Sequence, residues 1–234
     1  MLEDTLKRGL EAMSIPFDRD TLARFRTYYD LLEQRNRVMN LTAISGEDEV
    51  AVKHFLDSAA VLLRFPLAGN SAVDVGSGAG FPGLPLKILV PDLKLTLLDA
   101  QQKRVDFLSE VCAALGFDGD VRCLHARAEE AAALRESFDY ALARAVARLN
   151  VLAELCLPFV KADGAFLALK GPAAEEELAE AQRAVQLLGA KSEQIFDYDL
   201  PGEELRHNIV ALRKIAPTPK QYPRRFSQIK KSPL

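Results

Sequence analysis

Apolar residues recur at helical spacing in the first part of the chain and in short runs after it. Leu22, Phe25, Tyr29 and Leu32 follow one another at intervals of three and four, which predicts helices over residues 1 to about 48. Beyond them, short apolar runs alternate with longer amphipathic stretches. We predict strands at 71–75, 94–98, 120–124, 138–143, 164–169, 193–198 and 207–213, and helices at 83–90, 101–115, 127–134, 147–160 and 173–188.

The alternation of strands and helices predicts a largely parallel sheet with helices on both faces. The last two strands are joined through residues 199–202, a link too short for a crossover helix, so they should pair antiparallel. The expected fold class is therefore α/β and Rossmann-like, with a seven-stranded, mainly parallel sheet containing one antiparallel strand. We divide the chain into an N-terminal helical extension packed on the core (1–48), a core domain (49–213) and a basic C-terminal tail (214–234).

A glycine-rich segment follows the first predicted strand. Gly76, Gly78 and Gly80 alternate there, and residues without a Cβ allow a sharp turn and close approach to a ligand. A helix beginning near Pro82 would present free N–H groups to a polar ligand. Asp99 ends the second strand, where a carboxylate can accept hydrogen bonds from both ribose hydroxyls. These features predict a nucleoside cofactor.

The positions of the glycines relative to the end of the strand distinguish between a dinucleotide and other nucleoside cofactors. Residues 78–83 match GxGxxG, but the glycine that ends the strand is Gly76, so the third-glycine position falls on Phe81. That side chain would obstruct the close helix–sheet packing of a dinucleotide site. Asp74 has no part in holding a pyrophosphate but could meet the ammonium of an amino-acid moiety. S-adenosylmethionine is therefore favoured over a nicotinamide or flavin dinucleotide, and a turn that serves only the fold leaves Asp74 and Asp99 unexplained.

Charge is unevenly distributed along the 234 residues, whose net charge is −3. The tail from Lys214 onward carries six basic residues and no acidic one. Local cation density governs phosphate binding, so the tail is a candidate RNA contact, with a solvated, disordered tail as the alternative. Arg35 and Arg37 are further candidates, although a solvated helix face explains them as well. The RNA-contact candidates in the tail are Lys220, Arg224, Arg225, Lys230 and Lys231.

Cysteine and histidine positions indicate no metal site. Three scattered cysteines without a CxxC pair favour reduced, buried thiols in a cytoplasmic protein. No apolar run is long enough to span a bilayer, and the polar start is not typical of a signal peptide. His125 and His207 show no partner pattern, and we predict structural roles for them.

The carboxyl ends of the predicted strands carry further candidates. Arg144 ends a buried strand, where a guanidinium needs an anionic partner or ligand. Glu129 could bind an adenine edge or complement a helix N-terminus. His54 and Asp57 are three residues apart and share a helix face, either at the acceptor side of the pocket or as a simple hydrogen-bonded pair.

Several segments together resemble one family. They are residues 36–44 (NRVMNLTAI), 53–58 (KHFLDS), 74–83 (DVGSGAGFPG), 98–100, 103–105, 127–130, 144–145, 169–171 and the end KKSPL. They closely resemble the small-subunit ribosomal RNA guanine-N7 methyltransferase (GidB/RsmG) family over nearly the whole chain. The glycine-rich loop alone would indicate only the methyltransferase superfamily.

The resemblance implies a class I methyltransferase domain at 49–213 that moves a methyl group from S-adenosylmethionine to N7 of a specific guanine in 16S ribosomal RNA. It implies a cytoplasmic enzyme that works on the RNA, the small subunit or an assembly particle, without a metal or a membrane, and we expect a monomer. Family cofactor contacts map onto Gly76, Phe81, Asp99, Ala100, Gln101, Ala128, Glu129 and Arg144. The glycine-rich segment itself adds three further cofactor-binding candidates, Asp74, Gly78 and Gly80.

The residues are compatible with N7 chemistry. Residues 144–148 (RAVAR) lack the Asn/Asp-Pro-Pro-aromatic loop typical of exocyclic amine methylation, and Cys156 lies in an apolar run rather than at an activated position. Guanine N7 is an unprotonated acceptor with a free lone pair, so catalysis needs mainly positioning. Candidates for base positioning are Arg144, Arg148, Lys170, His54 and Asp57. The competing functions are a nucleoside-binding regulatory module and a nicotinamide-dependent oxidoreductase.

Overall fold

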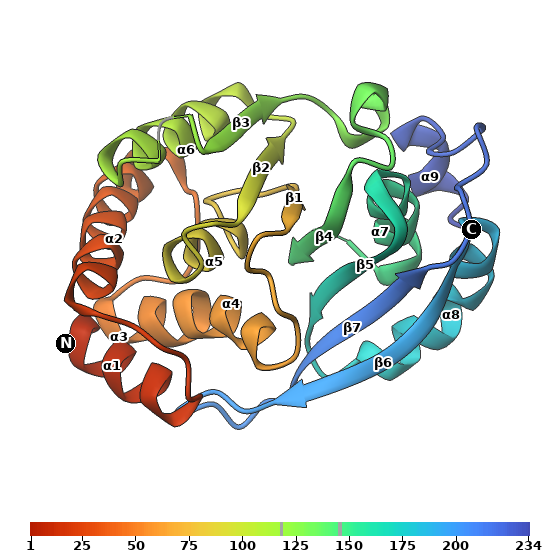
Figure 1. The fold of residues 1–234 in the computed structure, drawn as a ribbon. Coiled ribbons are helices and arrows are strands. Elements are labelled where there is room, and N and C mark those ends of the chain that lie inside the picture. The colour runs from red at the N-terminus through yellow and green to blue at the C-terminus, as the bar shows by residue number, and fades with distance from the viewer. Residues whose placement is uncertain (118, 145–146) are drawn as a thin grey trace.

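The computed structural model describes residues 1–117, 119–144 and 147–234, so positions 145–146 of the family-like segments lie outside the described residues. Its fold is a single twisted sheet with helices on both sides (Figure 1). The α-helices are α1 (Leu2–Ala12), α2 (Arg19–Met39), α3 (Glu47–Val50), α4 (Asp57–Ala59), α5 (Gly83–Leu89), α6 (Gln102–Ala114), α7 (Leu149–Cys156), α8 (Ala174–Leu187) and α9 (Phe226–Lys231). A π-helix, Ala51–Leu56, joins α3 to α4.

The sheet has seven strands in the order β3-β2-β1-β4-β5-β7-β6. Strands β1 to β5 run parallel, and β7 runs antiparallel to both of its neighbours. The predicted fold class, with one reversed strand, is therefore confirmed. The strands are β1 (Ser71–Val75), β2 (Lys94–Asp99), β3 (Val121–His125), β4 (Phe138–Arg144), β5 (Val160–Lys170), β6 (Ala190–Tyr198) and β7 (His207–Lys214).

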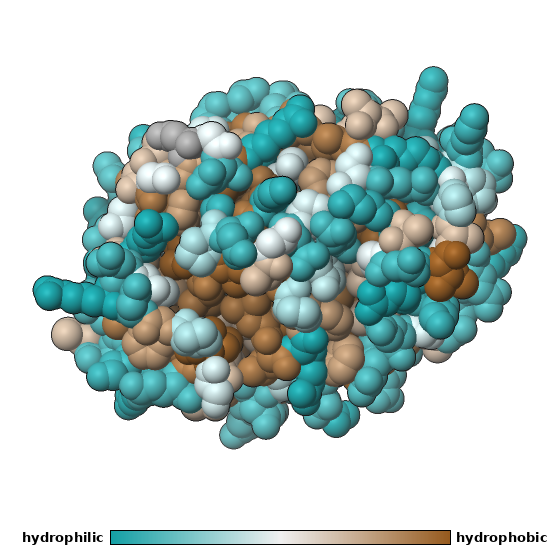
Figure 2. Space-filling model, in the orientation of Figure 1, coloured by the Kyte–Doolittle hydropathy of each residue, from teal (hydrophilic) through white to brown (hydrophobic). Residues whose placement is uncertain are grey.

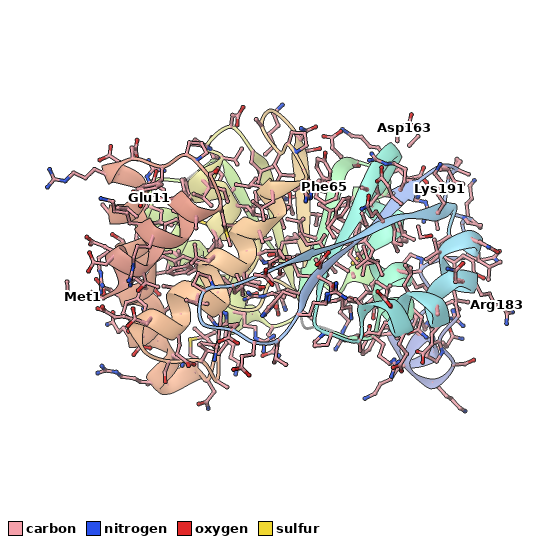
Figure 3. All side chains as sticks on the ribbon, turned by 90° about the horizontal axis from the view of Figure 1, so that it is seen from below. Met1, Glu11, Phe65, Asp163, Arg183 and Lys191 are labelled. Carbon is pink, nitrogen blue, oxygen red and sulfur yellow. The ribbon has the colours of Figure 1, made fainter. Side chains whose placement is uncertain are left out.

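Alternating side chains of the sheet feed two separate hydrophobic clusters, because successive strand residues point to opposite faces. In β1, Ala72 belongs to the cluster that contains residues of α1, α2, α5 and α6, whereas Val73 and Val75 belong to the cluster that contains residues of α7, α8 and α9. Seen from below, Met1 and Glu11 lie on one side of the sheet and Arg183 of α8 on the other (Figure 3). In the space-filling view, an apolar area overlies α4 and α5 inside a hydrophilic rim (Figure 2).

The N-terminal helices share the first cluster with the sheet. Leu6, Phe25 and Tyr28 are fully buried there together with Phe55. Tyr28 also donates a hydrogen bond to the carbonyl of Ala79 in the glycine-rich loop, at 2.5 Å. The N-terminal extension therefore supports the loop directly.

Two predicted helices differ from the observed ones. Residues 127–134 form two 3-10 turns, Ala128–Glu130 and Ala132–Leu134, in place of one α-helix. The helix predicted at 147–160 ends at Cys156, followed by a 3-10 turn containing Pro158, whose ring disfavours a longer helix. The segment after residue 47 is helical but contains the π-helix, which apolar spacing alone does not reveal.

The sheet topology locates the site. The chain leaves β1 toward β2 and β3 on one side and returns to β4 on the other. In such open sheets, ligands bind beyond the carboxyl ends of the strands at this switch point. The carboxyl ends of β1, β2 and β4 carry Gly76, Asp99 and Arg144.

Candidate active site and cofactor pocket

The glycine-rich loop turns sharply after β1. Gly76, Gly78 and Gly80 all have positive φ angles, of 73°, 59° and 103°, which side chains disfavour. A Cβ on Gly80 would lie 2.5 Å from Leu84 Cδ1 and 2.6 Å from the Tyr28 hydroxyl. Glycine is therefore required at this position both by conformation and by close packing.

A cavity of about 420 Å³, here called the cofactor pocket, opens above this loop. Asp99 lies in its wall and is 3% exposed. One carboxylate oxygen of Asp99 accepts a hydrogen bond from the Gln101 N–H at 2.9 Å and the other accepts from the Gly78 N–H at 3.0 Å. These bonds fix the carboxylate at the end of β2. The predicted residues in the wall are Gly76, Gly78, Phe81, Asp99, Ala100, Gln101 and Arg144.

A smaller cavity of about 190 Å³, the nucleobase pocket, adjoins the cofactor pocket and shares Gly76 and Ala100 with it. Leu98 and Leu155 make its wall apolar, and the predicted residues Ala128 and Glu129 lie at its side. A mostly apolar cavity with the Glu129 carboxylate at its side is the kind of site that takes an apolar ligand with one polar edge.

A third cavity of about 570 Å³, the acceptor pocket, lies on the other side of Arg144. The three cationic candidates Arg144, Arg148 and Lys170 line it, together with Asp57. Lys170 donates to the Ala147 carbonyl and is 2.7 Å from a Glu177 carboxylate oxygen. Arg148 is exposed and pairs with acidic residues of α8. Arg144 lines both the acceptor and the cofactor pocket.

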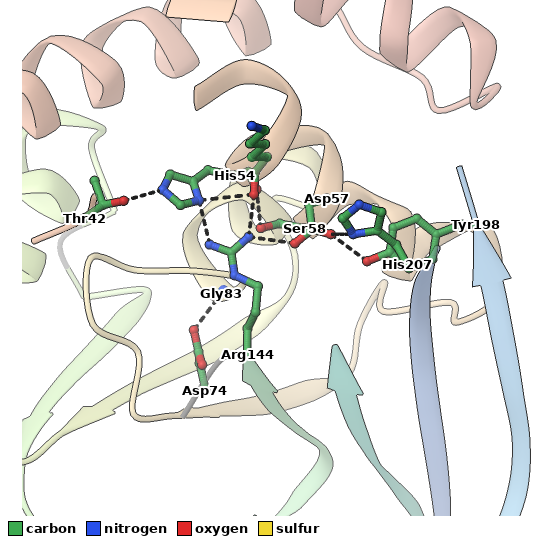
Figure 4. A network of polar contacts seen from close by, with 10 residues as sticks. Thr42, His54, Asp57, Ser58, Asp74, Gly83, Arg144, Tyr198 and His207 are labelled. Carbon is green, nitrogen blue, oxygen red and sulfur yellow. Dashed lines mark hydrogen bonds and ion pairs between the residues drawn. The ribbon is translucent and has the colours of Figure 1, made fainter. Parts of the chain in front are cut away.

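Arg144 is held in place by several bonds (Figure 4). It donates to Asp57 Oδ2 at 2.7 Å and to the Lys53 carbonyl at 3.1 Å. Its other terminal nitrogen lies 3.0 Å from His54 Nδ1, and its guanidinium carbon is 4.9 Å from the centre of the Phe81 ring. The anionic partner predicted for an arginine at this depth is therefore Asp57.

The protonation state of His54 follows from these contacts. A guanidinium has no acceptor, so Nδ1 of His54 must accept from Arg144, and Nε2 carries the proton that it donates to Thr42 Oγ1 at 2.8 Å. Burial, reinforced by the Arg144 charge, lowers the pKa of His54 from 6.5 to about 3. His54 is therefore neutral at physiological pH, and its lone pair is already engaged.

Asp57 collects donors from three other parts of the chain. Besides Arg144, it accepts from the Tyr198 hydroxyl at 2.7 Å and lies 3.3 Å from His207 Nδ1. Burial alone would raise the pKa of Asp57, but the hydrogen bond from His207, the Arg144 charge and the Tyr198 bond hold it below 3.8. Asp57 is therefore a carboxylate that fixes Arg144.

Asp74 lies beneath the glycine-rich loop rather than in the pocket wall. It is fully buried, and its Oδ2 accepts from the Gly83 N–H at 2.9 Å. Its Oδ1 has no hydrogen-bond partner among the described residues, and burial raises its pKa to about 7. Of the predicted cofactor residues, Asp74 and Gly80 thus support the loop from behind, and neither lines the cofactor pocket.

Comparison with known proteins identifies the family. The family model "GidB: rRNA small subunit methyltransferase G" matches residues 21–205. A ribosomal RNA small subunit methyltransferase G of Alkaliphilus metalliredigens is 46% identical over 98% of this chain and 97% of its own length. The corresponding protein of Pelotomaculum thermopropionicum is 45% identical over 100% and 99%.

The chain belongs to the rRNA small subunit methyltransferase G family.

Solved structures agree on the fold of this family member. A SAM-dependent methyltransferase from Aquifex aeolicus covers 67% of this chain and 89% of its own, with 20% identity and a TM-score of 0.51. The [4+2]-cyclase SpnF covers 82% and 94%, with 17% identity and a TM-score of 0.58. Because a cyclase shares the fold, the fold alone does not give the reaction.

Sequence reasoning missed several residues of the Arg144 network in this family member. Tyr198 was not singled out, and the sequence showed no partner for His207, which lies 3.3 Å from Asp57 and lines the acceptor pocket. The structural role of His207 stays a prediction. Thr42 lay within a family-like segment, but nothing in its spacing indicated a bond to His54. His125, in contrast, is exposed to solvent, with its Nε2 3.1 Å from the Ala100 carbonyl oxygen.

The predicted RNA contacts fall into two groups in the structure. Arg35 is bound through two nitrogens to Glu110, at 2.8 and 2.7 Å, and Arg224 is bound to Glu154, so both charges are already neutralised. The others have exposed side chains: Arg37, Lys220, Arg225, Lys230 and Lys231.

Two absences hold for the part of the chain that the structure describes. It contains no group of three or more His, Cys, Asp and Glu side chains placed to hold a metal ion. None of its helices is both long enough and apolar enough to cross a membrane. Cys112 and Cys156 are buried as predicted, whereas Cys123 is half-buried, 3.8 Å from the Cys112 sulfur.

Proposed function

We propose that this protein transfers a methyl group from S-adenosylmethionine to N7 of a specific guanine in 16S ribosomal RNA. The observation that carries the proposal is the position of Arg144, which forms a wall common to the cofactor pocket and the acceptor pocket. A methyl donor in the cofactor pocket and a nucleobase in the acceptor pocket would meet beside Arg144. Family membership supports the reaction and the class of substrate.

The cofactor would be held by residues already in place. Asp99 would accept hydrogen bonds from the ribose hydroxyls, since a carboxylate offers about four acceptor sites, and the described residues engage it with two backbone N–H groups and, at 3.5 Å, Arg104. The nucleobase pocket would take the adenine beside Glu129. When bound, S-adenosylmethionine supplies a sulfonium methyl group that a lone pair can attack.

Guanine N7 suits this site because the chain need not remove a proton. His54 is neutral but uses its lone pair on Arg144, and Asp57 is occupied by Arg144 and Tyr198. Holding the guanine in line with the methyl group can lower the activation barrier by about 7–11 kcal/mol through orientation alone. Arg148 and Lys170 line the acceptor pocket, and either would hold the guanine O6 by giving up its ion pair with an acidic residue of α8, while leaving N7 free.

We further propose that residues 49–213 carry out methyl transfer, whereas residues 1–48 support the loop and residues 214–234 complete the surface. Tyr28 supports this role of the N-terminal helices through its bond to Ala79. The direct test is mass mapping of guanine N7 methylation in 16S ribosomal RNA from a strain without the gene. Loss of one modification, restored by the wild-type gene, is the expected result; an unchanged map would exclude this substrate.

Replacing Asp99 by alanine should weaken S-adenosylmethionine binding about tenfold or more. Hydrogen bonds to a charged acceptor contribute about 1.5–3 kcal/mol each. Isothermal calorimetry would measure the change, with Asp106→Ala on the exposed face of α6 as a control that should bind normally. Equal affinity in Asp99→Ala would exclude Asp99 as the ribose partner.

Above the pKa of Asp74, which burial raises to about 7, single-turnover methyl transfer should be nearly independent of pH up to about 9. His54 has a pKa near 3, so it stays neutral over this whole range, and N7 requires no base. A log-linear rise that disappears in His54→Ala would make His54 a base and contradict the mechanism. If the rate changes with pH and this change disappears only in His207→Gln, the titrating group is His207, whose pKa is raised by its contact with Asp57.

The exposed cations of the tail should contact RNA phosphates. Replacing Lys230 and Lys231 by glutamine should reduce the slope of log affinity against log salt by roughly 0.7–0.9 per lost contact. The matched control replaces Lys7 and Arg8, exposed on α1, and should keep the wild-type slope. Equal slopes in both variants would remove the tail from the RNA surface.

A further inference from the structure

The C-terminal segment is fastened to the body of the protein in two places. The first lies at residues 218–222, where Thr218 donates its N–H to Glu136 Oε1 at 2.9 Å and its hydroxyl to the Leu188 carbonyl at 2.8 Å. The Arg135 guanidinium donates to the carbonyls of Thr218, Pro219 and Tyr222. The chain is therefore fixed before it reaches the nucleobase pocket.

The second attachment consists of two contacts, one just before the start of α9 and one within it. Arg224 donates its backbone N–H and its Nε to one oxygen of Glu154, at 2.9 and 2.8 Å, and a terminal nitrogen to the other at 2.5 Å. Glu154 is fully buried on α7. Five residues later, Ile229 is fully buried in the second hydrophobic cluster.

Phe226 lies between these two fixed points, yet its side chain is 37% exposed. It lines the nucleobase pocket together with Leu155, Ala128 and Glu129. A partly exposed aromatic ring beside an apolar cavity can pack against a planar ligand that enters the cavity. The other apolar walls, including Val75 and Leu98, come from the sheet.

We propose that Phe226 forms the outer wall of the adenine site and packs against the base when S-adenosylmethionine is bound. The proposal rests on the proposed function, because it assumes that the nucleobase pocket takes the adenine. It gives the C-terminal segment a role in cofactor recognition, in addition to any contact with RNA. Phe226 is a binding residue for the nucleobase, and Arg224 acts as its positioning residue.

Truncation of the ring tests the contact. Phe226→Ala should raise the Kd for S-adenosylmethionine about tenfold, since stacking of a base on an aromatic side chain contributes about 1–3 kcal/mol. Phe226→Tyr should retain most of the affinity. Gln228→Ala, an exposed position on the same helix, should bind as the wild type does. Unchanged thermal unfolding would show that the segment is still docked.

The absence of tryptophan from the sequence allows a second, direct test. In Phe226→Trp, the single indole should change its fluorescence when S-adenosylhomocysteine or adenosine is added, but not when methionine is added. Gln228→Trp should not respond. Wild-type affinity in Phe226→Ala, or equal responses from both indoles, would overturn the inference while the proposed function stands. If the wild-type protein does not bind S-adenosylmethionine in calorimetry, the proposed function itself is overturned.

Discussion

Replacing Arg144 by alanine should reduce the rate of methyl transfer by about 100-fold or more. Arg144 stands between the two pockets, and a displacement of about 1 Å in a positioned reactant can cost that factor. The change should also lower the free energy of unfolding, by at most about 3–5 kcal/mol, because the buried Asp57 carboxylate loses its guanidinium and keeps only Tyr198 and His207 as partners. Single-turnover rates at a temperature well below the unfolding midpoint would separate the two effects.

Two further variants sharpen this test. Arg144→Lys keeps the charge but cannot bind Asp57, His54 and the Lys53 carbonyl together, so it should remain slow while regaining part of the stability. Arg213→Ala removes a partly exposed arginine paired with Glu193 and should cost about 0–1 kcal/mol without slowing transfer. A wild-type rate of methyl transfer in Arg144→Ala would show that Arg144 does not position the reactants, and would contradict the proposed mechanism.

Replacing Arg224 by alanine should lower the free energy of unfolding by about 3–5 kcal/mol. Glu154 is fully buried, and the loss of its cation leaves a charge inside the protein without compensation. Urea unfolding would measure the loss, which should depend little on salt because a buried pair is poorly screened. The same variant should bind S-adenosylmethionine more weakly if Arg224 holds Phe226 at the pocket.

The double variant Arg224→Met, Glu154→Leu separates charge from packing. Apolar replacement of both partners removes the buried charge, so it should recover part of the lost stability. Arg225→Ala, whose side chain is exposed one residue later, serves as the control and should change the stability by less than about 0.5 kcal/mol. If Arg224→Ala is as stable as this control, the ion pair does not fasten the tail.

The features predicted correctly from the sequence are local in the chain. The seven strands, the glycines with positive φ and the position of Asp99 follow from short apolar runs and the residues directly after them. Arg144 could be singled out because a cation at the end of a buried strand is unusual. Its partners could not: Tyr198 and Asp57 are 141 residues apart, and only the folded sheet brings them together.

The tail shows a signal that was present but unused. The sequence makes all five cations beyond Lys214 candidates for RNA contact, with a solvated tail as the alternative, yet Arg224 is bound to Glu154. Glu154 is an acidic residue within an apolar helix, between Ala153 and Leu155. A carboxylate buried in such a run needs a cation or hydrogen-bond donors from elsewhere, and the structure supplies Arg224 from the tail.

The π-helix at Ala51–Leu56 contains a turn that is wider than an α turn. Within it, Phe55 packs against the N-terminal helices, whereas His54 and, directly after it, Asp57 contact Arg144. Since a π turn holds one more residue than an α turn, a single-residue deletion here would restore α geometry and leave the flanking helices in nearly the same phase. The register of the side chains inside the turn would change instead. The extra residue therefore acts as a local adjustment that lets neighbouring side chains serve the scaffold and the site.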